Sequence, residues 1–242
     1  MHVRAGLSQD GAEAFHSMLG WWQLAGVDVT VDDIPRQWLR APSAPISVPD
    51  HAVSAPVADV LPSSLEALTT WLGSPEIFAE LGARRIAPAG SAASGLMLLA
   101  DMPDNEDMGG DVLISGTAGR LLDAMLGAIG RDRESIYLAP FAPGRPATGQ
   151  LGPSLENELG RVARHHIALA RPRGVLLLGD ATIRALTGTG LAQARGSIHP
   201  INLDQATVPA IATFHPRFLL QQPARKADAW ADLRMLMEIL NR

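Results

Sequence analysis

Four short apolar runs recur along the chain from residue 96, and segments with helical periodicity lie between them. The runs are Leu96–Ala100, Ile136–Leu138, Val175–Leu178 and Val208–Ala212. A continuous apolar run of this length predicts a strand that is covered on both faces. Apolar residues repeated every three to four positions predict helices over Leu65–Leu72, Ala118–Ile129, Glu156–Ala168, Gly179–Leu186 and Trp230–Leu240.

Buried strands that alternate with helices predict a parallel sheet, because parallel neighbours need crossover connections. We therefore expect an α/β fold with a central four-stranded parallel sheet flanked by helices on both faces. Open sheets of this kind bind ligands beyond the carboxyl ends of their strands. The segments expected to carry function are Asp101–Asp107, Ala139–Arg145, Gly179–Ala181 and His215–Leu219.

The N-terminal quarter of the chain has a different character. Residues Ala12–Leu24 carry Trp21 and Trp22 in a helical pattern, whereas Arg40–Pro62 is rich in proline, serine and alanine without any period. The second stretch is typical of an extended linker. We place a boundary near residue 62, between an N-terminal appendage and a main domain of residues 63–242. The tryptophan-rich helix either packs on that domain or recruits a protein partner.

Composition excludes several classes of site. The 242 residues include 47% hydrophobic and 19% charged residues, the net charge is −5, and there is no cysteine. Disulfides, thiol nucleophiles and cysteine-bound zinc or iron–sulfur clusters are therefore excluded. Adjacent His165 and His166 face different sides of a helix and lack a third ligand, so we expect no metal. No apolar run could cross a bilayer, and we expect a cytoplasmic monomer without a nucleotide cofactor.

The last apolar run leads directly into Thr213–Leu220, with the sequence TFHPRFLL. Pro216 cannot continue a strand ladder, so the strand must end there and leave His215 at its carboxyl end. An apolar tip flanked by cations follows at Arg217–Leu220. This tip is suited to opening a base stack. The alternative is a strand-to-helix turn whose Phe218 and Leu219 return to the core.

Several spaced segments resemble the uracil-DNA glycosylase superfamily, and in particular its family that carries an iron–sulfur cluster. The matching segments are the buried strand and helix Arg171–Gly188, the pair Arg195–Gly196, and Ala212–Leu233, which contains His-Pro-x-x-Leu-Leu, Lys226 and Trp-x-Asp-Leu. The resemblance covers roughly residues 63 to 240. It implies a protein that binds DNA and repairs damaged bases.

The first half departs from that family at positions of chemical importance. Its Gly-Glu-Ala-Pro-Gly motif is here Ala100–Asp104, which keeps a carboxylate at Asp101. Its next motif contains a base-stacking phenylalanine, whereas Gly110–Gly119 has no aromatic residue. Its pyrimidine-reading asparagine is matched by Pro140, which has no side-chain donor or acceptor. The four cluster cysteines are absent, so the cluster is excluded. Similar changes occur in an alphaproteobacterial branch, which the chain also resembles.

The resemblance implies roles for individual residues. His215 would donate a hydrogen bond to a carbonyl oxygen of the extruded base, and Asp101 would orient water or steady the sugar cation. Arg217 to Leu220 would enter the duplex, and the helix starts Gly179–Ala181 and Gly116–Gly119 would hold phosphates. The residues expected to contact substrate or DNA are Pro103, Asp104, Leu113, Gly116, Gly119, Pro140, Gly179, Arg195, Arg217, Phe218, Leu219 and Lys226.

Structural alternatives remain open for the acidic residues. Asp101 could equally be a helix cap or a turn residue. Glu106 and Asp107 are typical of a solvated pair or a cap, and Asp180 is typical of a cap for the helix that follows it.

Three functions are compatible with these observations. The first is hydrolysis of the N-glycosidic bond of uracil, or a related deaminated base, after base flipping. The second is a protein of the same fold that has lost excision and binds DNA or a repair partner, as the missing aromatic residue and asparagine suggest. The third is excision of another base.

Overall fold

The computed structural model describes residue 17, residues 60–204 and residues 206–241. All of the predicted helix Ala12–Leu24 except residue 17, and nearly all of the predicted linker Arg40–Pro62, lie outside these ranges. Both segments, and the domain boundary near residue 62, therefore stay predictions.

Six strands of the described chain form one sheet in the order β1-β3-β2-β4-β6-β5. The strands are β1 (Ala89–Gly90), β2 (Leu96–Ala100), β3 (Tyr137–Pro140), β4 (Gly174–Leu178), β5 (Ile198–Asn202) and β6 (Thr207–Thr213). The central strands β3, β2, β4 and β6 are parallel, which confirms the predicted four-stranded parallel sheet. β1 and β5 were not predicted and add antiparallel edges. β5 escapes detection because it is largely exposed and contains Pro200, as edge strands can.

Side chains from the central strands alternate between two separate cores. On β2, Met97 and Leu99 join one hydrophobic cluster, whereas Leu96 and Leu98 join another. β4 divides its residues in the same way. This alternation follows from the two-residue period of a strand, and it explains why the strands have continuous apolar sequences.

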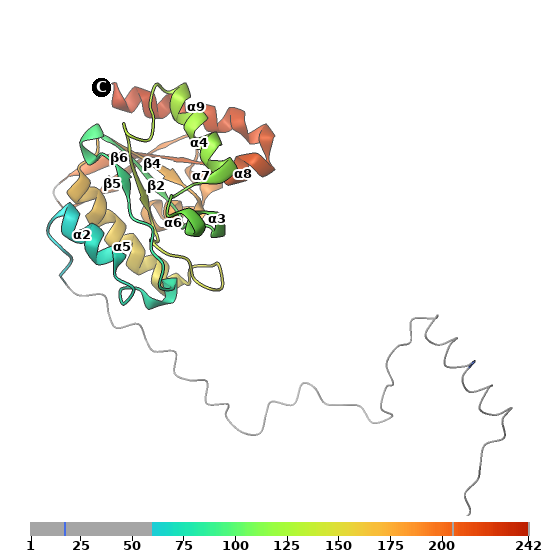
Figure 1. Ribbon diagram of the computed structural model, residues 1–242. Helices are drawn as coiled ribbons and strands as arrows, with labels where there is room; N and C mark the ends of the chain where they lie inside the picture. Colours follow the sequence, from blue (N-terminus) through green and yellow to red (C-terminus); the bar gives the residue numbers. More distant parts are fainter. Residues whose placement is uncertain (1–16, 18–59, 205, 242) are drawn as a thin grey trace, which may run out of the picture. The chain divides into compact units, whose positions relative to one another are not determined.

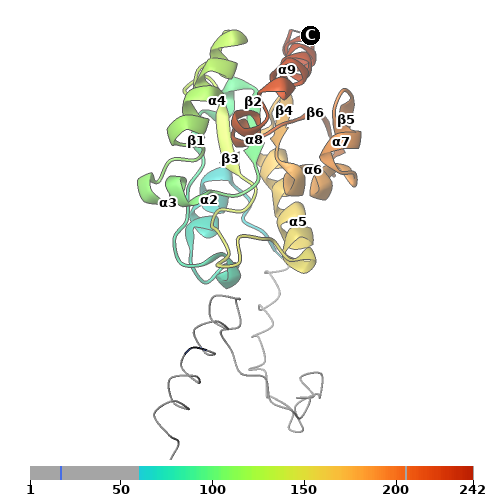
Figure 2. The ribbon, with the colours of Figure 1, turned by 90° about the vertical axis from the view of Figure 1, so that its right-hand side faces the viewer.

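Five longer helices cover the two faces of the sheet, as expected. Helices α2 (Leu65–Gly73), α5 (Pro153–Ala170) and α6 (Asp180–Thr187) contribute buried residues to the first cluster, and α4 (Gly116–Ala128) and α9 (Lys226–Leu240) contribute to the second. Figures 1 and 2 show α2 and α5 together on one side of the sheet and α4 and α9 on the other. The sheet is thus the middle of three layers.

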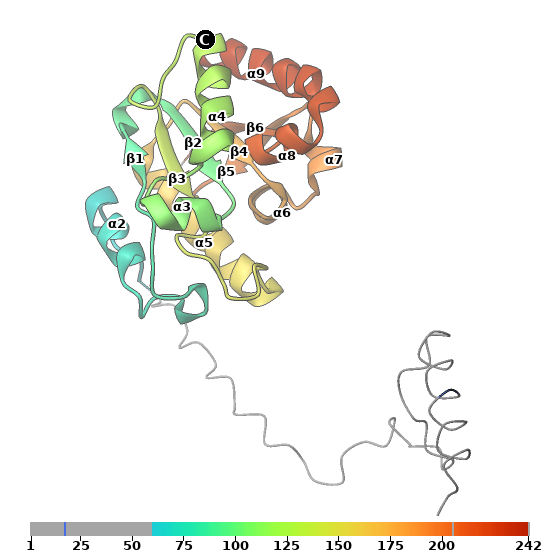
Figure 3. The ribbon, with the colours of Figure 1, turned by 45° about the vertical axis from the view of Figure 1, so that its right-hand side comes forward.

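Short helical elements occupy the connections. They are α3 (Asn105–Gly110), α7 (Leu191–Ala194), α8 (Pro216–Gln221), and the 3-10 turns η1 (Ala79–Leu81), η2 (Ala92–Ser94) and η3 (Pro223–Arg225). Three of the helices, α3, α6 and α8, follow β2, β4 and β6 respectively (Figure 3). No helix within the described ranges is both long and apolar enough to span a bilayer.

Candidate active site

The four parallel strands end in one row. Ala100 pairs with both Pro140 and Leu178, and Leu178 pairs with Thr213. The loops that follow are joined by backbone hydrogen bonds. The N–H of Asp101 donates to the carbonyl oxygen of Leu178 (3.0 Å), and the N–H of Ala142 donates to the backbone carbonyl oxygen of Asp101 (2.8 Å). The segments predicted to carry function therefore begin side by side at one edge of the sheet.

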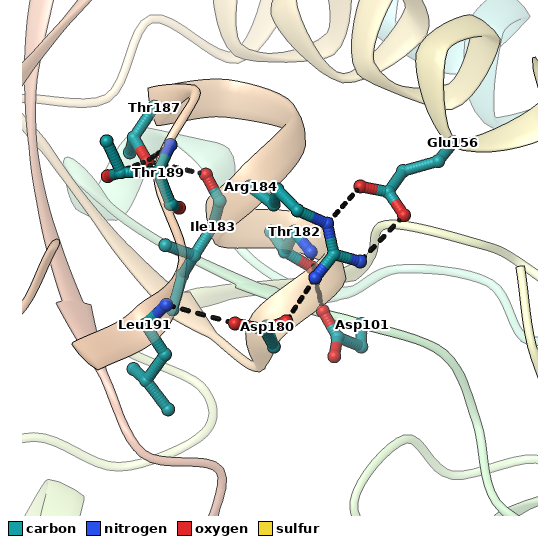
Figure 4. Close-up of polar contacts among 9 residues, drawn as sticks. All are labelled: Asp101, Glu156, Asp180, Thr182, Ile183, Arg184, Thr187, Thr189 and Leu191. Atoms are coloured by element: carbon teal, nitrogen blue, oxygen red, sulfur yellow. Dashed lines mark hydrogen bonds and ion pairs between the residues drawn. The ribbon is translucent and has the colours of Figure 1, made fainter. Parts of the chain in front are cut away.

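Asp101 begins the loop after β2, and its side chain turns toward α6. Its Oδ1 accepts hydrogen bonds from the backbone N–H (2.7 Å) and the hydroxyl (2.5 Å) of Thr182 (Figure 4). Burial raises the pKa of Asp101 above its ordinary value, while donors from Thr182 and Ala181 oppose that rise and the nearby charge of Asp180 adds to it. Asp101, which follows β2, thus caps the first turn of α6, which follows β4.

Gly179 makes room for this carboxylate. It adopts a positive φ of 108°, and a side chain at this position would collide with Asp101. Only glycine combines that backbone conformation with such close contact. The N-terminal N–H groups of α6 were expected to hold a phosphate, but a protein carboxylate already binds there.

Asp180 does not cap α6, contrary to the sequence-based expectation. It is the first residue of the helix, and the residue at the cap position is Gly179. The Oδ1 of Asp180 instead accepts a hydrogen bond from Leu191 at the start of α7 (2.9 Å), and its Oδ2 pairs with Arg184. Arg184 also forms a bidentate ion pair with Glu156 of α5, at 2.9 Å for each contact (Figure 4).

His215 lies between β6 and α8 and caps α8. Its Nδ1 accepts a hydrogen bond from the backbone N–H of Arg217 (3.2 Å), so the neutral ring carries its proton on Nε2. Burial lowers the pKa of His215 to about 4, and the negative charge of Asp107 opposes that shift. The imidazole is therefore neutral near pH 7, with Nε2–H left as a donor.

The loops after β2 and β6 meet through an ion pair between Asp104 and Arg217. Asp104 and Asp107 also form the capping box at the start of α3, and Asp107 is only 2% exposed. The Oδ1 of Asp107 accepts hydrogen bonds from the N–H and hydroxyl of Ser115, both at 2.7 Å. Asp107 is thus a cap, one of the two alternatives expected for it.

The start of α4 is also occupied by acidic residues. Gly116 has a φ of 58°, and a side chain there would collide with the carboxylate of Glu106. Gly119 allows the helix to approach the carbonyl of Ile114, since a Cβ at 119 would lie 2.6 Å from that oxygen. A phosphate approaching this helix start, like one approaching α6, would therefore meet a carboxylate.

Residues 87–234 match the family model described as the uracil DNA glycosylase superfamily. The chain belongs to the uracil DNA glycosylase superfamily. It is 23% identical over 158 residues to the type-4 uracil-DNA glycosylase of Archaeoglobus fulgidus, an alignment that covers 62% of this chain and 79% of that protein. It is 24% identical over 155 residues to the type-4 uracil-DNA glycosylase of Pyrobaculum aerophilum, covering 60% and 78% respectively.

The tip Arg217–Leu220, which we expected to enter DNA, is only partly exposed. Phe218 is 39% exposed and Leu220 is 40% exposed, whereas Leu219 is 1% exposed and packs with Phe214 and Ala229. Of the predicted tip, Phe218 and Leu220 are therefore exposed, whereas Leu219 returns to the core as the alternative interpretation expected. Adjacent residues of a helix project about 100° apart, so Leu219 can face the core while Phe218 and Leu220 on either side of it stay exposed.

Arg195 contacts protein groups instead of extending into solvent. Its Nε bonds the buried carboxylate of Asp232 (2.8 Å), which also accepts from the hydroxyl of Thr213 (2.8 Å). Its guanidinium lies 4.2 Å from the ring centroid of Phe214, and the ring of Phe218 stacks on Phe214 at 5.0 Å. Arg195 thus holds the end of β6 against α9 and supports the exposed Phe218.

The remaining predicted contacts differ in accessibility. Pro103, Leu113 and Pro140 are buried, and the carbonyl of Pro103 accepts from Arg145 (3.2 Å). Lys226 is exposed at the start of α9. Of the side chains expected to contact DNA, Lys226, Phe218 and Arg217 have the freest access to a ligand.

Thr182 is a contributor that the sequence pattern did not reveal. Thr182 lies in an ordinary helical pattern, and no local signal pairs it with Asp101. Three open pockets of about 340 to 380 Å³ lie on the described surface, and neither Asp101 nor His215 lines any of them. The described residues contain no group of three His, Cys, Asp or Glu side chains suited to a metal ion.

Proposed function

We propose that this member of the superfamily is a DNA repair glycosylase that hydrolyses the N-glycosidic bond of uracil or a related deaminated base. The observation that carries the proposal is the state of His215. A backbone N–H fixes its Nδ1 as the acceptor, and its low pKa keeps the ring neutral. Nε2–H is thereby ready to donate to a carbonyl oxygen on the departing base.

Cleavage requires stabilisation of two developing charges. The base leaves with the electron pair of its bond to C1′, and a hydrogen bond from His215 to the base oxygen disperses that negative charge. The sugar becomes cationic, and the Asp101 carboxylate stabilises it or orients the water that adds to C1′. Because β2 and β6 are separated by β4 alone, the two loops begin about 10 Å apart.

DNA would contact exposed side chains rather than the helix starts. The starts of α4 and α6 face Glu106 and Asp101, so a phosphate would be repelled from both. Phe218 and Leu220 are exposed beside His215 and suit a role in separating stacked bases. Lys226 is exposed on the following helix and supplies positive charge for the backbone.

An assay of base release tests this proposal. Single- and double-stranded oligonucleotides containing uracil, hypoxanthine or xanthine are incubated with the protein and then treated with alkali. We expect strand scission that falls at least a hundredfold in His215→Ala and Asp101→Asn. His199→Gln on the edge strand β5 is the matched control and should retain activity, because His199 contacts the backbone carbonyl of Ala194. Unchanged scission in His215→Ala would refute the assigned role.

A second function has a specific observation in its favour. Pro140 occupies the strand end at which the superfamily reads a pyrimidine, and it is buried without a side-chain donor. This favours a protein that binds DNA or a repair partner without excising a base, or one that excises a different base. Absence of scission on every substrate, together with salt-sensitive DNA binding, would support the non-excising alternative.

A further inference from the structure

Thr182 is a buried hydroxyl directed at the candidate catalytic carboxylate. The residue is 0% exposed in the first turn of α6, and its Oγ1 donates to Oδ1 of Asp101 at 2.5 Å. The backbone N–H of the same residue donates to the same oxygen at 2.7 Å. Both hydrogen bonds thus hold one oxygen, and Oδ2 takes part in neither.

The hydroxyl is not required by the helix. The backbone N–H of Thr182 already satisfies the helix cap through Asp101, and a valine would fill the same volume with better burial. A buried hydroxyl is costly unless it is hydrogen-bonded, and within the described part of the chain Asp101 is the partner of Oγ1. We therefore attribute the hydroxyl to its hydrogen bond with the carboxylate of Asp101 rather than to packing.

We propose that Thr182 is a positioning residue for Asp101: its two donors tie Oδ1 and leave Oδ2, which lies beside Gly179, outside both bonds as the oxygen that would meet the attacking water or the sugar cation. The catalytic consequence rests on the proposed function. The orientation itself is reinforced by the backbone of Asp101, which is bonded to β4 and to the loop after β3. Gly179 supplies the space in which the carboxylate lies.

Charged groups around Asp101 define the effect of losing the hydroxyl. Burial and the charge of Asp180 raise the pKa of Asp101, and the Thr182 hydroxyl is the strongest of the hydrogen bonds that lower it. Asp180 is paired with Arg184, which is shared with Glu156 of α5. Arg217 of α8 pairs with Asp104, and His215, at the start of the same helix, is neutral near pH 7. Removing the hydroxyl should therefore raise the pKa of Asp101 further.

The test compares Thr182→Val with Thr182→Ser. Excision should decline as the pH falls through the pKa of Asp101, because the ionised carboxylate is required. In Thr182→Val this acid limb should move up by roughly one pH unit, and the maximal rate should fall about tenfold as Asp101 loses its fixed orientation. Thr182→Ser keeps the hydroxyl and should restore both. Thermal unfolding verifies that each variant is folded, and Thr182→Ala replaces the valine variant if that protein is unstable.

Carboxyl titration of Asp101 by NMR gives a readout that does not depend on activity. The side-chain pKa should rise in Thr182→Val and return in Thr182→Ser. If the unaltered protein excises no base, the proposed function fails, while the titration still tests the link between Thr182 and Asp101. If the protein excises a base and Thr182→Val leaves the pH profile and the titration unchanged, the role of Thr182 is refuted.

Discussion

His166 and His215 have pKa values well below the usual range of histidine, because burial disfavours the charged imidazolium. His166 is 2% exposed on α5, and its Nε2 lies 2.9 Å from the hydroxyl of Tyr137. Burial lowers the pKa of His166 to about 4, and the neighbouring charge of His165 acts in the same direction. His215 reaches a similar pKa through burial, but its free donor lies at the carboxyl edge of the sheet, whereas His166 is enclosed between α5 and β3.

The pKa of His166 predicts acid sensitivity of the fold. Between about pH 6.5 and pH 4 the unfolded chain binds a proton that folded His166 does not, so stability should fall as the pH decreases through this window. The unfolding free energy should fall between pH values near 7 and near 4.5. We expect this fall to be smaller by about 2 kcal/mol in His166→Gln than in the unaltered protein. Urea denaturation at both pH values measures it.

His199→Gln, on the exposed edge strand, is the control for removal of a histidine. An equal pH dependence in His166→Gln and the unaltered protein would contradict this origin of acid sensitivity.

The loop that precedes β1 is held by a single cation. The guanidinium of Arg85 donates to the carbonyl oxygens of Pro75, Ile77, Phe78, Leu81, Gly82 and Arg84. It also lies against Gly144 in the loop after β3, where a Cβ would be 2.7 Å from its Nη1. The adjacent N–H of Ile86 donates to Pro143 (2.7 Å). Arg85 thus fastens the loop before β1 against the loop after β3.

Removing this cation should destabilise the domain. In Arg85→Met, several partly buried carbonyl groups lose a charged donor, and we expect the unfolding free energy to fall by about 2 to 4 kcal/mol. Arg84→Met is the matched control, because Arg84 pairs with Asp111 on the exposed surface and should change stability by less than about 0.5 kcal/mol.

Urea denaturation measures the difference between the two variants. Amide hydrogen exchange at Ile86 reports local opening of the same loop. Equal effects of the two substitutions would show that Arg85 does not hold the loop.

The distribution of acidic residues bears on how the whole molecule meets DNA. The chain has a net charge of −5, and Asp101, Glu106 and Asp107 lie at the starts of α6 and α4. Asp104 is neutralised by Arg217 in the same region. A DNA strand approaching this edge therefore meets negative charge at two helix starts that would otherwise attract phosphate.

Glu106→Gln should strengthen DNA binding. Removing the carboxylate beside Gly116 should tighten binding by roughly two- to fivefold at low salt, and the gain should shrink as salt rises. Glu134→Gln is the control, because Glu134 is exposed in the loop before β3, which lies at the amino ends of the parallel strands.

Fluorescence anisotropy over a series of salt concentrations measures the effect. Equal effects of the two variants would show that DNA does not approach α4.

Local sequence pattern was sufficient for the central architecture. The apolar runs of β2, β3, β4 and β6 and the periodicity of the longer helices predicted three layers, because buried strands and amphipathic helices impose their periods on residues close together in the chain. The same logic placed Asp101 and His215 at the carboxyl edge, since Pro216 ends β6 and Asp101 follows β2 directly. The edge strands β1 and β5 were missed because they are short or exposed.

The chemistry at that edge depends on partners far apart in the chain. Asp101 bonds Thr182 across 81 positions, and Arg195 bonds Asp232 across 37. Leu219 is buried by its packing against Phe214 and Ala229. None of these partners has a local signature, because a hydrogen bond or a packing contact is specified by where the folded elements meet. Periodicity therefore defined the sheet and its carboxyl edge, whereas three-dimensional packing assigned Asp101 to the start of α6 and left Nε2–H of His215 as a donor.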